Sequence, residues 1–202
     1  SLDAELDVRI GKASTTFGRL QKRVWGNSHL YHSVKFEVDK ACVLSTLLYG
    51  SESWATHMKH EHRLNAFHFR CLRSILGLTW NDRVPNTEIL KTSKMWDMYT
   101  MLRSRRLRWT GHVVRMNDHR LPKAILYGQL RNAARPVGRP KLRYKDCVKR
   151  DLSAFGIDHD SWEAQAQCRP AWKAALSKGS TKSAEIYTTF CDRRRWRRHH
   201  QK

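Results

Sequence analysis

The sequence predicts a mainly α-helical protein, on two observations. Apolar residues recur at spacings of three and four along most of the chain, whereas no stretch of comparable length shows the alternation of a β-strand. Hydrophobic residues make up 40% of the chain, and eight tryptophans are enough to anchor a packed core. We therefore expect a helical bundle over residues 1–116, a basic linker rich in proline and glycine over 117–140, and a small helical C-terminal region over 141–202.

The first predicted helix covers residues 1–25, where Leu2, Leu6 and Ile10 begin an apolar stripe at helical spacing. Because Ser1 already stands at the start of this pattern, we expect the chain to be a piece of a longer protein. Two further helices are predicted at about 32–49 and 60–77, and the glycine at the end of each favours a helix stop.

A helix predicted at about 95–116, after a short one from about residue 86, has two apolar sides and one basic side. At about 100° per residue, Leu102 and Val113 fall on one apolar side and Leu107 on the other. The third sector contains Arg105, Arg108, His112 and Arg115. We expect this helix to be wedged between layers, with only its basic sector facing outward.

The remainder of the chain is predicted to alternate loose and helical segments. Prolines and glycines loosen residues 117–140, and a basic helix is expected at about 141–155. Two short helices are expected within 157–179, followed by a basic tail over 191–202.

Net charge is the strongest indication of function. The chain carries +21, and residues 101–150 hold 15 Lys and Arg against two acidic residues. Clustered cations favour a surface that faces phosphates, because binding releases the counterions condensed on a nucleic acid. We predict that the following residues contact nucleic acid: Arg103, Arg105, Arg106, Arg108, His112, Arg115, Arg135, Arg139, Lys141, Arg143, Lys145, Lys149 and Arg150.

The stretch "ARPVGRPKLRYKD" (residues 134–146) has some features of a segment that inserts into the DNA minor groove. Such segments use Arg-Gly-Arg, but here Val137 precedes Gly138, so one inserting arginine is missing. Phosphate contact is the favoured interpretation, with groove insertion and an unengaged loop as alternatives. Pro140 could also simply begin the next helix.

The sequence predicts no catalytic or metal-binding residues. Phosphodiester chemistry needs clustered carboxylates for divalent metal, and the 18 acidic residues include no adjacent Asp-Asp pair. The histidines between 57 and 68 and Cys71 lack an evident fourth zinc ligand, so zinc binding is left open.

The chain is expected to be nuclear or cytoplasmic, without a membrane or small-molecule partner. Five scattered cysteines without a Cys-x-x-Cys pair favour reduced thiols. Neither a secretion signal nor an apolar run of membrane-spanning length is visible in this sequence.

Several blocks occur in the same order as in a known family: "RIGKASTTFGRLQKRVW", "ACVLSTLLYGSESW", "RLNAFHFRCLRSILGLTWNDRVPN", "RRLRWTGHVVRM", "RLPKAILYGQL" and "GRPKLRYKDCVKRDL". From residue 1 to about 173, the chain resembles the C-terminal part of the endonuclease–reverse transcriptase of LINE-type non-LTR retrotransposons. The last residues show only the general basic character of that family.

This resemblance implies that the helical bundle is the thumb and that the rest is the nucleic-acid-binding extension of an RNA-directed DNA polymerase. Its partners would be template RNA and primer or target DNA. The catalytic palm would precede this chain, so Mg²⁺ is expected for the parent polymerase and no cofactor is expected in this chain. The alternative is a stand-alone basic DNA- or RNA-binding protein derived from a retrotransposon remnant.

Overall fold

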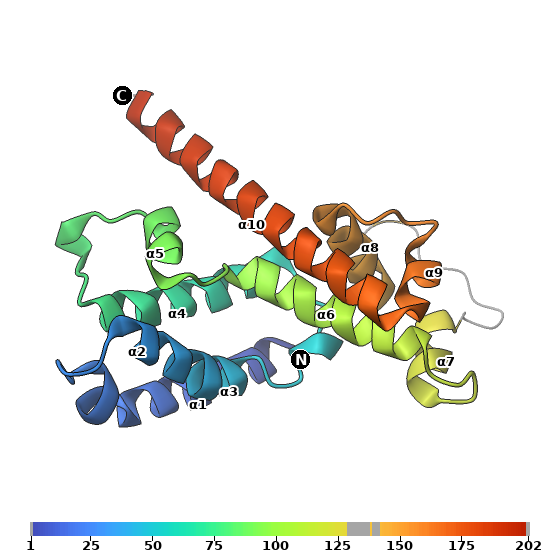
Figure 1. Cartoon of the computed structure of the whole chain (residues 1–202), viewed down its shortest axis with the longest axis horizontal. Helices are drawn as coiled ribbons and strands as arrows, with labels where there is room; N and C mark the ends of the chain where they lie inside the picture. Colours follow the sequence, from blue (N-terminus) through green and yellow to red (C-terminus); the bar gives the residue numbers. More distant parts are fainter. Residues whose placement is uncertain (1, 129–137, 139–141, 201–202) are drawn as a thin grey trace. The chain divides into compact units, whose positions relative to one another are not determined.

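The computed structural model describes residues 2–128, 138 and 142–200, and within them every regular element is a helix (Figure 1). The predicted mainly α fold is therefore confirmed. The helices are α1 (Leu2–Arg19), α2 (His32–Val38), α3 (Ser45–Leu47), α4 (Met58–Leu76), α5 (Asn86–Ser93), α6 (Met98–Val114), α7 (Leu121–Tyr127), α8 (Tyr144–Phe155), α9 (Trp162–Gln167) and α10 (Arg169–His200).

The chain divides into two compact units, and each is described by itself. The first unit comprises residues 1–50, 58–100 and 184–202; the second comprises 51–57 and 101–183. The helices α6 and α10 contribute residues to both. The three-part division expected from the sequence stays a prediction, because part of its linker lies outside the described residues.

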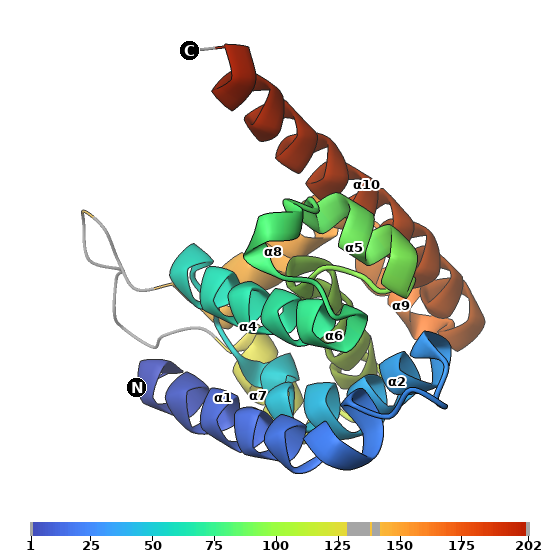
Figure 2. The same ribbon diagram turned by 90° about the vertical axis from the view of Figure 1, so that its left-hand side faces the viewer.

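In the first unit, α1 packs on α3 and α4, and α4 also packs on α2 and α5 (Figure 2). The apolar stripes predicted from spacing form its core, with Leu6 of α1, Leu47 of α3 and Leu64 of α4 all fully buried. The predicted helix over 32–49 is interrupted by a wider π-helical turn at Asp39–Leu44, and a second such turn, Gln21–Trp25, follows α1 closely. Two further short turns of 3-10 helix lie at Ser51–Ser53 and Trp80–Asp82.

The core of the second unit forms between α6, α8 and the first half of α10. A glycine in α6 allows α10 to pack closely against it. Trp172 of α10 is buried, and its indole Nε1 donates to the Leu107 carbonyl of α6 at 3.1 Å. A Cβ atom at Gly111 would lie 2.2 Å from that nitrogen. The glycine in the block "RRLRWTGHVVRM" therefore makes room for the tryptophan ring.

Three expectations need correction. The expected basic tail is helical as far as His200, because α10 runs for 32 residues without interruption. The expected loose segment contains α7, with Pro122 in its first turn. Helix α8 begins at Tyr144 rather than at 141, and the Arg143 amide there donates to the Asp146 carboxylate at 3.0 Å. Pro140, considered as a possible first residue of that helix, lies outside the described residues.

Candidate nucleic-acid interface

The basic sector predicted for α6 points away from the core of the second unit. Leu107, Val113 and Val114 of this helix are buried, whereas Arg108 and His112 are exposed. Arg105 and Arg115, in the same sector, are half-buried. The helical spacing thus separates the core-facing residues of α6 from a cationic side, as the periodicity predicted.

The half-buried arginines of this sector are held by contacts within the second unit. Burial lowers the pKa of the Arg105 guanidinium, while nearby Glu52 raises it and Arg108 lowers it further. Arg115 donates to the backbone carbonyl of Ala166. The Arg105 guanidinium keeps its charge at neutral pH, because an arginine side chain stays protonated in proteins.

Arg106, which the sequence placed in the nucleic-acid-binding set, has a different role. Its side chain and that of Asp151 of α8 are both 0% exposed, and Arg106 Nε and Nη2 donate to the two carboxylate oxygens at 2.6 and 3.2 Å. Arg106 Nη1 donates to Thr56 Oγ1 at 2.7 Å and to the Trp54 carbonyl at 3.3 Å. A guanidinium enclosed in this way cannot reach a phosphate, so we remove Arg106 from the candidate interface.

Arg103 and Arg150 gather around the same carboxylate. Each Nε lies 3.8 Å from Asp151 Oδ1, and both side chains are only partly exposed. Arg103 also donates to Ser183 Oγ at 3.0 Å, and Arg150 to the Thr56 carbonyl at 3.5 Å. The structure therefore brings three predicted arginines together, but around an acidic residue that the sequence reasoning missed.

The cations of α8 differ in how freely they face solvent. Lys149 is exposed, whereas Lys145 is half-buried with its ammonium 5.9 Å from the ring centre of Tyr127. Arg143 is exposed but forms an ion pair with Asp146 at 3.0 Å, and that hydrogen bond raises the pKa of Arg143. The remaining predicted residues Arg135, Arg139 and Lys141 lie outside the described residues.

Polar contacts join α6 to α8 at two places. Besides the Arg106–Asp151 pair, the hydroxyls of Thr110 and Tyr144 lie 3.1 Å apart and join the middle of α6 to the start of α8. Of the predicted cations, Arg108 and Lys149 form no ion pair with any residue that the structure describes. These two are the cations most available to a phosphate.

Two of the histidines considered for zinc, His60 and His68, form other contacts. His60 Nε2 lies 3.1 Å from Asp3 Oδ1, and His68 Nε2 lies 3.2 Å from the Trp96 carbonyl. Burial lowers the pKa of His68 to about 4. Within the described ranges, no three His, Cys, Asp or Glu side chains are grouped so that they could hold a metal ion.

Among the helices in the described part of the chain, none is both long enough and apolar enough to cross a membrane.

The chain is distantly similar to a transposon-derived protein. The chain is 26% identical over 157 residues to an uncharacterized transposon-derived protein of Caenorhabditis elegans, and the match covers 74% of this chain. It covers 56% of the nematode protein, so the chain spans little more than half the length of that relative. No family model matches the chain, and no solved structure matches it.

Proposed function

We propose that this chain is the nucleic-acid-binding C-terminal portion of a retrotransposon RNA-directed DNA polymerase, holding template RNA and primer DNA. The observation that carries the proposal is that α6 and α8 of the second unit expose the cations Arg108 and Lys149, neither of which forms an ion pair with a described residue. The similarity to a transposon-derived protein supports the same conclusion. So does the resemblance of the sequence blocks to LINE-type enzymes.

The arrangement fits contact with phosphates rather than recognition of bases. At about 1.5 Å per residue, the basic sector of α6 from Arg105 to Arg115 extends about 15 Å. Along one strand of a duplex the charges are about 3.4 Å apart on the axis, so a row of this length spans about four phosphates of one groove edge. Arginine and lysine bound to phosphates fix the position of a duplex without reading its sequence.

On this proposal, catalysis belongs to another part of a longer protein, where carboxylates would bind Mg²⁺. We expect no primer extension by the purified chain with an RNA template, a DNA primer, nucleotides and Mg²⁺. Template-dependent extension by this chain alone would contradict the assignment of the active site to another part of the protein.

The binding proposal is tested by removing the two most available cations. In the double variant Arg108→Ala, Lys149→Ala, the slope of log Kobs against log[salt] for an RNA–DNA duplex should fall by up to about 1.8, because each lost phosphate contact removes about 0.9. The matched control is Lys22→Ala, Arg23→Ala, which removes two exposed cations from the first unit. Equal slopes for the two double variants would refute the proposed interface.

A further inference from the structure

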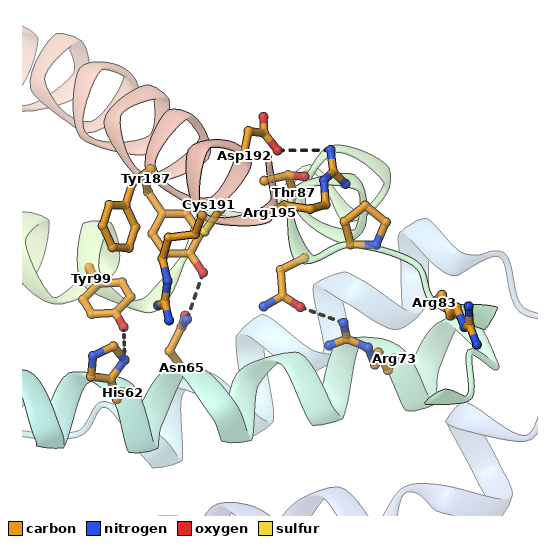
Figure 3. Close-up of a pocket in the computed structure, with 14 residues that line it drawn as sticks. His62, Asn65, Arg73, Arg83, Thr87, Tyr99, Tyr187, Cys191, Asp192 and Arg195 are labelled. Atoms are coloured by element: carbon orange, nitrogen blue, oxygen red, sulfur yellow. Dashed lines mark hydrogen bonds and ion pairs between the residues drawn. The ribbon is translucent and has the colours of Figure 1, made fainter. Parts of the chain in front are cut away.

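The first unit contains a cleft that no pattern in the sequence predicted. Its volume is about 480 Å³, within the usual range for small-ligand sites. Its lining residues come from α4, from α5 and the segment before it, from the start of α6 and from the second half of α10 (Figure 3). Four arginines and one aspartate are among the described residues that line it, which makes the cleft strongly cationic.

Three of these arginines come from separate segments of the chain. Arg73 of α4 donates to the Val84 carbonyl at 3.2 Å and to Asn86 Oδ1 at 2.7 Å, which fix its guanidinium at the cleft wall. Arg195 of α10 lies 3.4 Å from Asp192, its neighbour along the helix. Arg83 lies at one end of the cleft in Figure 3, and its side chain forms no ion pair with a residue that the structure describes.

The backbone at Arg83 is unusual. Its φ of 49° is in the left-handed region, which costs an ordinary side chain about 1 kcal/mol or more. The Asp82 carboxylate accepts from the Thr79 amide at 2.6 Å and from its hydroxyl at 2.9 Å, and so stabilises the turn that imposes this conformation. An arginine, rather than glycine or asparagine, therefore occupies a strained position beside a cationic cleft.

An aromatic surface borders the same cleft. Phe190 of α10 is 54% exposed, and the Arg194 guanidinium lies 5.7 Å from its ring centre. Tyr187, one turn earlier, packs against Tyr99 with 5.5 Å between ring centres, and its hydroxyl accepts from the Asn65 amide at 3.1 Å. An exposed ring beside arginines is the usual platform for an unpaired base, because every base has an aromatic face.

We propose that this cleft binds one unpaired nucleotide of a single RNA or DNA strand, with its phosphate on Arg73, Arg83 and Arg195 and its base against Phe190. The proposal rests on the proposed function, because both require that the chain binds nucleic acid. It concerns different residues, those of the cleft, and a single strand instead of a duplex. A second cleft shares His62, Asn65, Arg73 and Asn86 with the first and adds Arg70. It offers a path for the neighbouring nucleotides, which favours a strand over a free nucleotide.

Cys191 lines the cleft and serves as a reporter, whereas Cys42 is an exposed thiol outside it. The full chain is alkylated with iodoacetamide, and the modification of each cysteine is followed by peptide mass spectrometry. A single-stranded hexanucleotide at about ten times its Kd should slow alkylation of Cys191 about tenfold, because only the free fraction reacts. Cys42 should react at an unchanged rate. RNA and DNA hexanucleotides form separate arms and identify the preferred sugar.

Protection of Cys191 by other ligands identifies the chemical class of ligand that the cleft binds. A nucleoside monophosphate should protect Cys191 only at higher concentration than the hexanucleotide, and a blunt RNA–DNA duplex should protect it less. Protection by inorganic phosphate as strong as that by the hexanucleotide would overturn the proposal in favour of a simple anion site. Equal protection of Cys42 and Cys191, or protection of neither, would also overturn it.

Two variants test the assigned groups without disturbing the core. Phe190→Ala should weaken hexanucleotide binding about tenfold by loss of stacking. Arg83→Asn should weaken it too, and asparagine tolerates the left-handed backbone. The matched control is Arg23→Ala, an exposed arginine of the same unit outside the cleft. If both cleft variants bind the hexanucleotide with wild-type affinity, this inference is refuted. The proposed function is tested separately by duplex binding: if Arg108→Ala, Lys149→Ala weakens duplex binding, the proposed function still holds.

Discussion

Replacing Asp151 by asparagine should unfold the second unit more readily than any other single polar change described above. The carboxylate is fully buried, accepts two hydrogen bonds from Arg106, and lies 3.8 Å from Arg103 and from Arg150. Burial raises the pKa of Asp151, and the surrounding guanidinium groups oppose that shift. The two hydrogen bonds from Arg106 favour the ionised form of the Asp151 carboxylate. Asparagine keeps the shape of the side chain but leaves the Arg106 charge buried without a counter-charge.

Removing one partner of a buried ion pair costs about 3–5 kcal/mol, most of it from the charge left behind. For a chain of this size, each kcal/mol lowers Tm by about 2–4 °C, so Asp151→Asn should melt about 10 °C lower, as followed by circular dichroism. The double variant Arg106→Met, Asp151→Leu removes both charges and should recover most of this loss. A Tm within about 2 °C of wild type for Asp151→Asn, a cost below about 1 kcal/mol, would refute the reasoning.

Two further stability predictions come from other buried positions. Gly111→Ala should lower the free energy of unfolding by about 1–3 kcal/mol in chemical denaturation, because the new Cβ would meet the Trp172 indole. The control Gly11→Ala should be neutral or stabilising, because no atom lies within 4 Å of the added Cβ. Equal effects of the two substitutions would contradict this account. Burial raises the pKa of Asp39 to about 7 from 3.8, and no described residue hydrogen-bonds its carboxylate. The folded state therefore holds a proton that the unfolded state has lost between pH 4 and 7, so stability should fall by up to about 4 kcal/mol as pH rises through that window. Asp39→Asn should abolish this fall, and a fall of the same size in that variant would disprove the assignment to Asp39.

Local periodicity predicted α6 well, because which side of a helix a residue occupies depends only on its position along the helix. It separated the exposed Arg108 and His112 from the buried Leu107 without any knowledge of the partners of that helix. It could not identify the buried Arg106, because the partner Asp151 stands 45 residues away in the sequence. The missed signal was an aspartate within the apolar face of a basic helix.

Long-range and compositional features were predicted less well. The arginine run after residue 192 indicated a solvated tail, yet arginine favours helices and no proline follows Pro170, so α10 continues to His200. The cleft was not predictable, because Arg195 is far from Arg73 and Arg83 in the sequence. Only the tertiary packing of the first unit assembles them.

The central claim is that the exposed cations of α6 and α8, Arg108 and Lys149 above all, contact a nucleic-acid backbone. Ultraviolet crosslinking of the purified chain to an RNA–DNA duplex, followed by peptide mass spectrometry, tests it most directly. We predict crosslinked peptides that contain Arg108 and Lys149 and that disappear at high salt, because phosphate contacts are screened. Efficient crosslinking confined to peptides outside 103–115 and 143–150, or no crosslinking under low salt, would contradict the account.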